Sequence, residues 1–182
     1  MKIVVTEFIT LDGVMEAPNE WSFPYWGDDI AKLKLDELFA ADAHLLGRAT
    51  YQGFAAAWPE RTDEAGFADR MNSLPKYVVS TTLESAEWNN STIIKTDVAE
   101  KLADLKKQPG GDMLVAGSAT LIDFLIENDL VDEYRLLTYP IVVGKGKRLF
   151  KDGSSAKLKL VESKPLASGV VLLRYAPDRS DK

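Results

Sequence analysis

Residues 45–50 read Leu-Leu-Gly-Arg-Ala-Thr, a short apolar run that passes through glycine into a helix-forming segment. Two more apolar runs end in a similar way: residues 78–82 read Val-Val-Ser-Thr-Thr, and residues 114–120 read Leu-Val-Ala-Gly-Ser-Ala-Thr. Ligands of open α/β sheets bind beyond the carboxyl ends of the strands, where glycine admits a phosphate and a helix N-terminus offers free N–H groups. Any one of these turns could be an ordinary capped connection. Three of them, one with an arginine, predict a site for a phosphorylated ligand.

Short apolar or β-branched segments predict the strands of a mainly parallel sheet. These segments are residues 2–9, 43–46, 76–80, 92–94 and 113–116. Helical patterns lie between them, at residues 29–41, 98–105 and 121–126, and this alternation indicates parallel strands joined by crossover helices. Asp97, followed by Glu100, is a capping-box signature for the second of these helices.

The C-terminal part of the chain has a different pattern. Residues 133–143, 158–164 and 170–175 have strand character, with turns but no helix between them. We therefore predict one α/β domain over residues 1–182, a three-layer fold with a mostly parallel central sheet, helices on both faces and an antiparallel C-terminal edge. The strand at residues 170–175 is expected at that edge, and because exposed edges need covering, a homodimer is expected.

Composition narrows the possible partners. The chain has no cysteine and a formal net charge of −6, with 28 acidic and 22 basic residues. No metal site is expected, since thiolate ligands are absent, and an acidic domain does not favour nucleic acid. No apolar stretch approaches the length of a membrane span or a signal-peptide core. We therefore expect a cytoplasmic protein with a small-molecule ligand. The one histidine, His44, is expected to be a structural residue with its hydrogen bonds satisfied.

The order of the motifs resembles that of the dihydrofolate reductase superfamily. Residues 46–51 are similar to the Met-Gly-Arg-x-Thr-aromatic segment of dihydrofolate reductases, and residues 79–82 and 115–120 to their Ser/Thr pair and glycine turn. Residues 8–14, Phe-Ile-Thr-Leu-Asp-Gly-Val, and residues 136–140, Leu-Leu-Thr-Tyr-Pro, resemble more closely the reductase domain of bifunctional riboflavin-biosynthesis proteins and its stand-alone relatives. The resemblance covers nearly the whole chain.

This resemblance implies an NADPH site. Residues 47–50 and 117–120 would hold the cofactor phosphates at two helix N-termini, and residues 80–82 would surround the ribose 2′-phosphate. The cofactor-binding residues it implies are Gly47, Arg48, Ala49, Thr50, Ser80, Thr81, Thr82, Gly117, Ser118, Ala119 and Thr120.

The chain departs from the family at the catalytic acid. Dihydrofolate reductases carry a carboxylate on the first helix, but the family's spacing places Ala31 there, with Asp28 and Asp29 in the preceding turn. Asp12 is then the best remaining acid near the nicotinamide and our candidate proton donor, although an Asp-Gly turn explains it equally well.

Aromatic residues concentrate between the first strand and the first helix. They would either stack on a planar substrate or anchor a long loop against the core. The candidate substrate-binding residues are Trp21, Trp26 and Tyr139.

The function implied by the resemblance is hydride transfer from NADPH to a small planar heterocycle, such as a pterin or a pyrimidine. Such an enzyme would be similar to 5-amino-6-(5-phosphoribosylamino)uracil reductase or to dihydrofolate reductase. Because no proton donor is assured, a non-catalytic NADP-binding sensor module stays open as an alternative. A purely structural α/β domain would have no nucleotide affinity.

Overall fold

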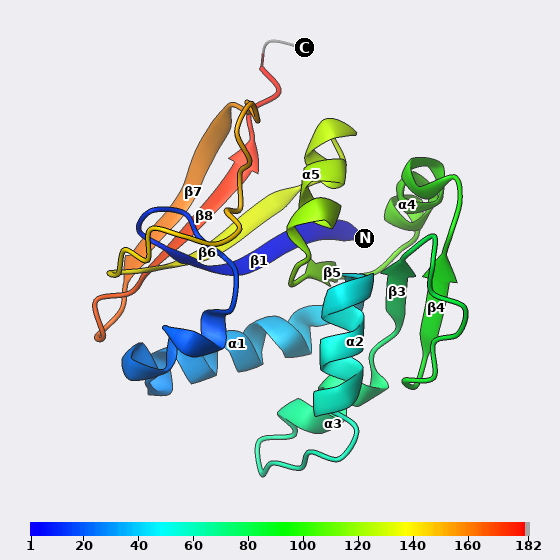
Figure 1. Cartoon of the computed structure of the whole chain (residues 1–182), viewed down its shortest axis with the longest axis horizontal. Coiled ribbons are helices and arrows are strands. Elements are labelled where there is room, and N and C mark those ends of the chain that lie inside the picture. Colours follow the sequence, from blue (N-terminus) through cyan, green and yellow to red (C-terminus); the bar gives the residue numbers. More distant parts are fainter. Residues whose placement is uncertain (181–182) are drawn as a thin grey trace.

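A mixed sheet organises the chain. The computed structural model describes residues 1–180, and its eight strands lie in the order β4-β3-β2-β5-β1-β6-β8-β7. The strands are β1 (Lys2–Thr10), β2 (Ala41–Gly47), β3 (Lys76–Val79), β4 (Ser91–Ile94), β5 (Asp112–Val115), β6 (Glu133–Tyr139), β7 (Leu158–Pro165) and β8 (Val171–Pro177). Strands β1 to β6 pair in parallel, whereas β8 runs antiparallel to both β6 and β7 (Figure 1).

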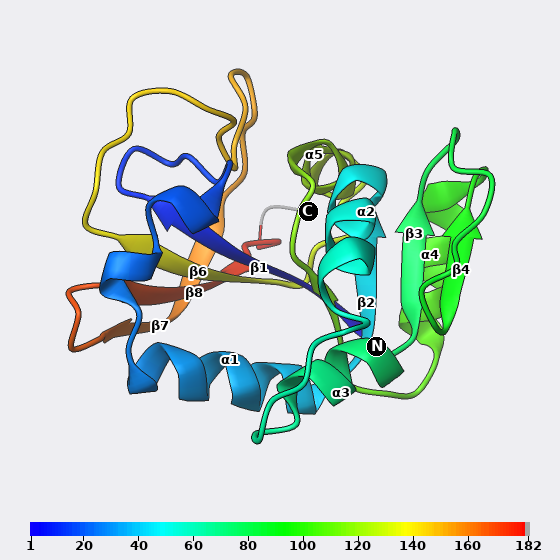
Figure 2. The same cartoon turned by 60° about the horizontal axis from the view of Figure 1, so that its bottom comes forward.

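Helices cover both faces of this sheet (Figure 2). They are α1 (Asp28–Ala40), α2 (Arg48–Ala57), α3 (Phe67–Ser73), α4 (Val98–Lys107) and α5 (Ala119–Glu127), and two short 3₁₀ helices, η1 (Pro18–Glu20) and η2 (Phe23–Tyr25), precede α1. Leu38, Tyr51 and Met71 of α1, α2 and α3 are buried against one face. Leu102 of α4 and Ile122 of α5 are buried against the other. The predicted three-layer α/β fold with an antiparallel C-terminal edge is therefore confirmed. No helix in residues 1–180 is long and apolar enough to cross a membrane.

Three details of the sequence-based prediction are wrong. The strand predicted at residues 170–175 is not an edge strand, because β8 pairs with β6 on one side and with β7 on the other. Helix α3 was not predicted, since a helix of one or two turns carries little periodic signal. Asp97 precedes α4 in a left-handed conformation, with φ 53°, and its side chain caps no N–H within the described residues.

The central strand β1 outruns its neighbour β5. β1 pairs with β5 from Lys2 to Val5 but with β6 from Val4 to Thr10. Beyond Val5, one side of β1 therefore faces the turn that follows β5 instead of another strand. The sheet opens at this point, beyond the carboxyl end of β5, where open α/β sheets bind their ligands.

Two loops, at residues 11–17 and 140–157, lie side by side near the carboxyl end of β1 (Figures 1 and 2). We call them the loop pair. Val14 and Arg148 form an isolated antiparallel bridge between them. The backbone N–H of Lys147 donates to Glu16 at 3.1 Å, and that of Gly144 donates to Asp12 at 2.9 Å. The glycine-rich segment at residues 144–146 thus belongs to this loop pair, and no helix follows it as a dinucleotide turn requires.

Candidate functional site

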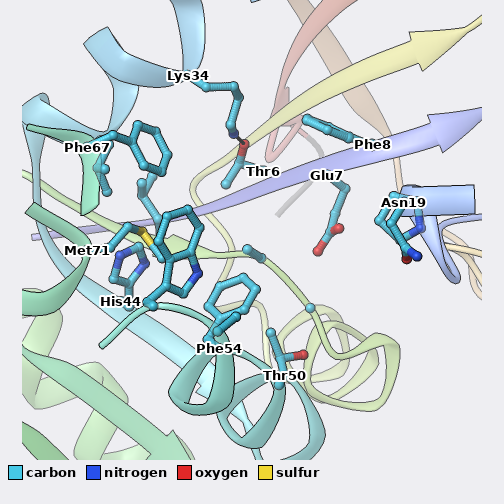
Figure 3. Close-up of a pocket in the computed structure, with 18 of the residues that line it drawn as sticks. Thr6, Glu7, Phe8, Asn19, Lys34, His44, Thr50, Phe54, Phe67 and Met71 are labelled. Carbon is cyan, nitrogen blue, oxygen red and sulfur yellow. Dashed lines mark hydrogen bonds between the residues drawn. The ribbon is translucent and has the colours of Figure 1, made fainter. Parts of the chain in front are cut away.

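A cavity of about 1440 Å³ occupies the space where β1 leaves β5. Thr6, Glu7 and Phe8 of β1 line it, together with α1, α2, the turn before α5 and the loop that carries Asn19 (Figure 3). Typical small-molecule sites occupy about 300–1,000 Å³. The cavity therefore has room for more than one ring system.

The N-termini of α2 and α5 meet at one wall of this cavity. A Cβ added at Gly47 would lie 2.4 Å from Ser118 Oγ, and one added at Gly117 would lie 2.9 Å from Thr50 Oγ1. Gly117 also has a φ of +88°, a conformation that favours glycine. The first and third sequence motifs are therefore packed against each other. Four consecutive residues from Gly117 to Thr120, with Ala49 and Thr50 of α2, line the cavity.

This wall fits a cofactor pyrophosphate. Two helix N-termini direct unpaired N–H groups and positive dipole ends to one place, and the glycines allow a close approach to the backbone. The geometry is that of an anion site built from backbone, so no buried cation is needed there.

The second sequence motif lies farther out. Val79 pairs with Gly47, so Ser80 follows the strand next to β2. Ser80 Oγ accepts the N–H groups of Thr82 and Leu83 at 3.2 and 2.9 Å, which folds this segment into a turn. Thr81, Thr82 and Arg48 are exposed. None of these residues lines the cavity.

Glu7 is an acid that the sequence analysis overlooked. It lies on β1, just beyond the last β1–β5 pair, with 9% of its surface exposed. Figure 3 shows its carboxyl group directed into the cavity, across from Thr50. Burial raises the pKa of Glu7 to about 8, against an opposing effect of Lys34 and of the Gly117 backbone. The signal was present in the sequence, as one carboxylate within the apolar run of residues 3–9.

Ala31 does line the cavity, at the position where the spacing of dihydrofolate reductases predicts their carboxylate. Its neighbours form an apolar chamber between α1, α2 and α3. The bulky side chains of this chamber are Leu35, Leu38, Phe54, Trp58, Phe67 and Met71. A planar, uncharged ring system suits such walls.

One partly buried cation that lines the cavity, Lys34, is already paired. Lys34 forms an ion pair with Glu37 and donates to Thr6 Oγ1 at 2.8 Å. Glu37 also accepts from Thr6 at 2.9 Å and faces Arg135 at 3.5 Å. Although burial opposes it, these partners lower the pKa of Glu37, with Lys34 the main cause. The positive and negative charges of this cluster therefore offset one another. A second cation that lines the cavity, Arg61, stacks over Trp58, 4.8 Å from the ring centre.

His44 is buried but its hydrogen bonds are not satisfied, contrary to the sequence-based expectation. The residue lines the cavity with 3% of its surface exposed, and neither ring nitrogen has a partner among the described residues. Burial lowers the pKa of His44 to about 4, helped by the nearby Lys76 and Lys34 charges. The imidazole is therefore neutral at physiological pH.

Asp12 lies outside the cavity lining, at the turn after β1. Its carboxylate accepts from Thr10 Oγ1 at 2.6 Å and from the N–H groups of Gly144 and Val143 at 2.9 and 3.3 Å. These hydrogen bonds, that of Thr10 first, lower the pKa of Asp12 to about 2. A proton donor must hold its proton near neutral pH. Asp12 is therefore poorly suited to that role, and the turn explanation accounts for its contacts.

The three aromatic candidates lie in different environments. Trp21 is buried, and its indole N–H donates to the Glu16 carbonyl at 3.0 Å. Tyr139 is fully buried, with its ring 5.2 Å from Trp21 and 5.4 Å from Phe8. Neither lines the cavity, so both anchor the loop. Trp26 does line it, half-exposed, with its ring 6.3 Å from Phe8.

Comparisons with known proteins agree on one family. A family model described as the RibD C-terminal domain matches residues 1–172. The uncharacterized protein YyaP of Bacillus subtilis (strain 168) is 34% identical over 179 residues, covering 96% of this chain and 94% of YyaP.

Solved structures share the fold. A protein from Shewanella sp. PV-4, provisionally described as a riboflavin biosynthesis protein, has a TM-score of 0.76 and 22% identity, covering 98% of this chain and 100% of its own. Dihydrofolate reductase from Enterococcus faecalis, solved in complex with NADP(H), has a TM-score of 0.63 and 15% identity, over 97% and 96% of the two chains.

Proposed function

The chain belongs to the RibD C-terminal domain family, and from that membership we propose that it is an NADPH-dependent reductase of the riboflavin-pathway type. The substrate would be a small planar heterocycle of the pterin or pyrimidine kind. The observation that carries the proposal is the meeting of the α2 and α5 N-termini at the wall of one large cavity. The proposal includes a cytoplasmic location and a homodimeric state.

Different residues of this chain would bind different parts of NADPH. The backbone N–H groups at Ala49, Thr50 and residues 117–120 would hold the pyrophosphate. Arg48, with Ser80, Thr81 and Thr82, would bind the 2′-phosphate, since a phosphate monoester takes hydroxyl donors and a guanidinium well. The bound cofactor supplies a hydride, and the protein supplies orientation and a dry site.

The apolar chamber would receive the substrate ring. Its aromatic walls favour a flat molecule, and Trp26 at the opening would cover it. Lys34, which lines the same cavity, already forms an ion pair with Glu37 and a hydrogen bond with Thr6.

Calorimetric titration with NADPH and NADH tests the proposal. The wild-type protein should bind NADPH more tightly than NADH. Arg48→Ala should weaken NADPH binding by roughly 1.5–3 kcal/mol, the range for hydrogen bonds to charged groups, and leave NADH nearly unchanged. Arg148→Ala is the matched control, because Arg148 is exposed and outside the cavity lining.

Two results would change the picture in different ways. Equal losses for both cofactors in Arg48→Ala would move Arg48 to the pyrophosphate. A wild-type protein that binds neither cofactor would overturn the proposal.

A non-catalytic NADP-binding sensor is a second candidate. The observation in its favour is Ala31, which puts a methyl group in the cavity at the position expected for the first-helix carboxylate of dihydrofolate reductases. The two candidates differ in turnover. Loss of reduced-nicotinamide absorbance on addition of pterins and pyrimidines supports the enzyme, whereas cofactor binding without oxidation across such a panel supports the sensor.

A further inference from the structure

Glu7 has fewer side-chain partners than Glu37, a buried acid with a structural role. Glu37, on the neighbouring helix, has Thr6, Lys34 and Arg135 as partners. Glu7 Oε1 is fully covered and has no hydrogen-bond partner in residues 1–180. A buried polar group without a partner costs free energy and is retained where it serves another purpose. The backbone of Gly117 offsets part of that cost, and because Glu7 lines the cavity, its carboxyl group is placed for contact with a ligand.

The position of Glu7 connects the two halves of the cavity. A Cβ added at Gly117 would lie 3.9 Å from Glu7 Oε1 and 2.9 Å from Thr50 Oγ1, so the carboxyl adjoins the wall made by the helix N-termini. Phe8, the next residue of β1, lines the same cavity. Glu7 thus lies beside the wall made by the helix N-termini, in the same cavity as the apolar chamber.

Few charges around Glu7 change near neutral pH. Lys34 and Glu37 on α1 form an ion pair, and Arg135 on β6 faces that pair. His44 on β2 is neutral because its burial lowers its pKa to about 4. The turn before α5 contributes the backbone N–H of Gly117 and α2 contributes Thr50, neither of which titrates. Glu16 and Lys147, at the cavity opening, are exposed to solvent.

We propose that Glu7 is the acid that protonates the substrate, in place of the carboxylate that dihydrofolate reductases carry on the first helix, and that it lies beside the nicotinamide end of the bound cofactor. This proposal rests on the proposed function. Reduction of a C=N or C=C bond adds a hydride to one atom and a proton to the other. Glu7 breaks its O–H bond to give the proton, becomes a carboxylate, and regains a proton from solvent.

A measurable coupling follows without any substrate. The oxidised nicotinamide ring carries a positive charge and the reduced ring carries none. A carboxylate beside the ring favours the oxidised form, and a neutral carboxylic acid does not. By linkage, affinity for NADP⁺ should rise as pH increases through the ionisation of Glu7, while affinity for NADPH should not.

The experiment is a titration of both cofactors onto the wild-type protein, Glu7→Gln and Glu7→Asp. The dissociation constants are measured between about pH 7 and about pH 9, above the second ionisation of a phosphate monoester. In the wild type the ratio of the NADP⁺ to the NADPH dissociation constant should fall about tenfold over this range, as one ionising carboxylate near a cation produces.

The variants separate a direct role from a structural one. Glu7→Gln should bind NADPH and show a flat ratio, whereas Glu7→Asp should keep part of the pH dependence. Glu100→Gln, an exposed change on α4, should behave as the wild type. A flat wild-type ratio with intact binding, or an unchanged slope in Glu7→Gln, would overturn the assignment of Glu7 alone. No binding of either cofactor would instead overturn the proposed function, and this assignment with it.

Discussion

At the scale of single residues, three carboxylates near β1 differ in protonation because their surroundings differ. Glu37 has charged and hydroxyl partners, which lower its pKa despite burial. Asp12 accepts three hydrogen bonds in a turn, which lowers its pKa to about 2. Burial raises the pKa of Glu7 to about 8, because Lys34 and the backbone of Gly117 offset only part of the effect of burial. Only Glu7 of these three is suited to give a proton near neutral pH.

The pH dependence of the free energy of unfolding should reveal the ionisation of the Glu7 carboxyl group. Its folded-state pKa of about 8 is above the ordinary 4.5, so the folded protein binds more protons than the unfolded chain between these values. The contribution of Glu7 to stability is therefore fully present below about pH 4.5 and is lost as pH rises through about 8. Glu7→Gln should match the wild type in urea unfolding at about pH 5 and exceed it by a few kcal/mol at about pH 9. Identical pH profiles for the two proteins would contradict this.

Asp12→Ala should reduce the stability of the loop pair more than it reduces the affinity for NADPH. The change removes the acceptor for Thr10 Oγ1 and for the N–H groups of Val143 and Gly144. Faster amide hydrogen exchange at residues 143–144 and a lower unfolding temperature are expected, with NADPH affinity nearly unchanged. A large loss of NADPH affinity with normal loop protection would return Asp12 to the binding site.

At the scale of elements, the site depends on how closely the starts of α2 and α5 approach each other. Gly117→Ala adds a methyl group 2.9 Å from Thr50 Oγ1 at a φ of +88°. The turn must move, so stability should fall by about 1 kcal/mol or more and NADPH binding should weaken. Gly53→Ala in α2 is the control for stability, because its Cβ would meet no atom within 4 Å, although Gly53 also lines the cavity. That change should be neutral or stabilising by up to about 1 kcal/mol. Equal effects of the two substitutions would mean that the close approach is unimportant.

The start of β3 depends on one buried lysine. Lys76 Nζ donates to the carbonyls of Asn72, Leu74 and Asn89 at 2.6, 2.8 and 2.9 Å, and lies 4.2 Å from the Trp88 ring centre. Lys76→Met would leave three carbonyls without this donor and should cost about 3 kcal/mol or more in urea unfolding.

Lys95→Met is the control for that substitution. Lys95 is exposed and pairs with Glu84 at 3.5 Å on the surface, and such pairs contribute about 0–1 kcal/mol. A similar cost for both lysines would show that the three carbonyls find other donors.

At the scale of the whole molecule, the outer edge of the sheet at β7 determines how two copies could meet. Leu160 and Val161 on this strand are 52% and 53% exposed, and exposed apolar edges tend to be covered. We expect a homodimer in sedimentation at micromolar concentration, and Val161→Lys should shift it towards the monomer. A wild-type protein that sediments as a 20.1 kDa species would refute this.

Local patterns predicted the fold well and the site only in part. The parallel core followed from apolar runs such as residues 113–116, because a buried strand must be apolar whatever its neighbours are. The approach of Gly47 to Ser118 could be expected from the motif order, since parallel strands end at one side of the sheet. The order of β7 and β8 was predicted wrongly, because either one could have paired with β6.

The acid of the site escaped prediction for a different reason. Glu7 is one carboxylate in a strand, and its importance depends on β5 ending at Val115, which leaves Glu7 without a strand neighbour on that side. Strand lengths on opposite sides of a sheet are not encoded near residue 7. The chamber walls from α3 escaped for the same reason, since Phe67 and Met71 meet α1 and α2 only after folding.

The central position of β1 has a consequence for the order of events during synthesis. Ile3 pairs with Met113 and Val4 with Glu133, so this central strand has no neighbour until the chain has been made through β5, and it gains its second neighbour only with β6. Pairings between such distant segments close slowly, and the apolar strand is open to wrong partners in the meantime. Nascent chains that stop before Asp112 would therefore keep Ile3, Val4 and Val5 without a strand partner, and the centre of the sheet can form only as β5 and then β6 leave the ribosome.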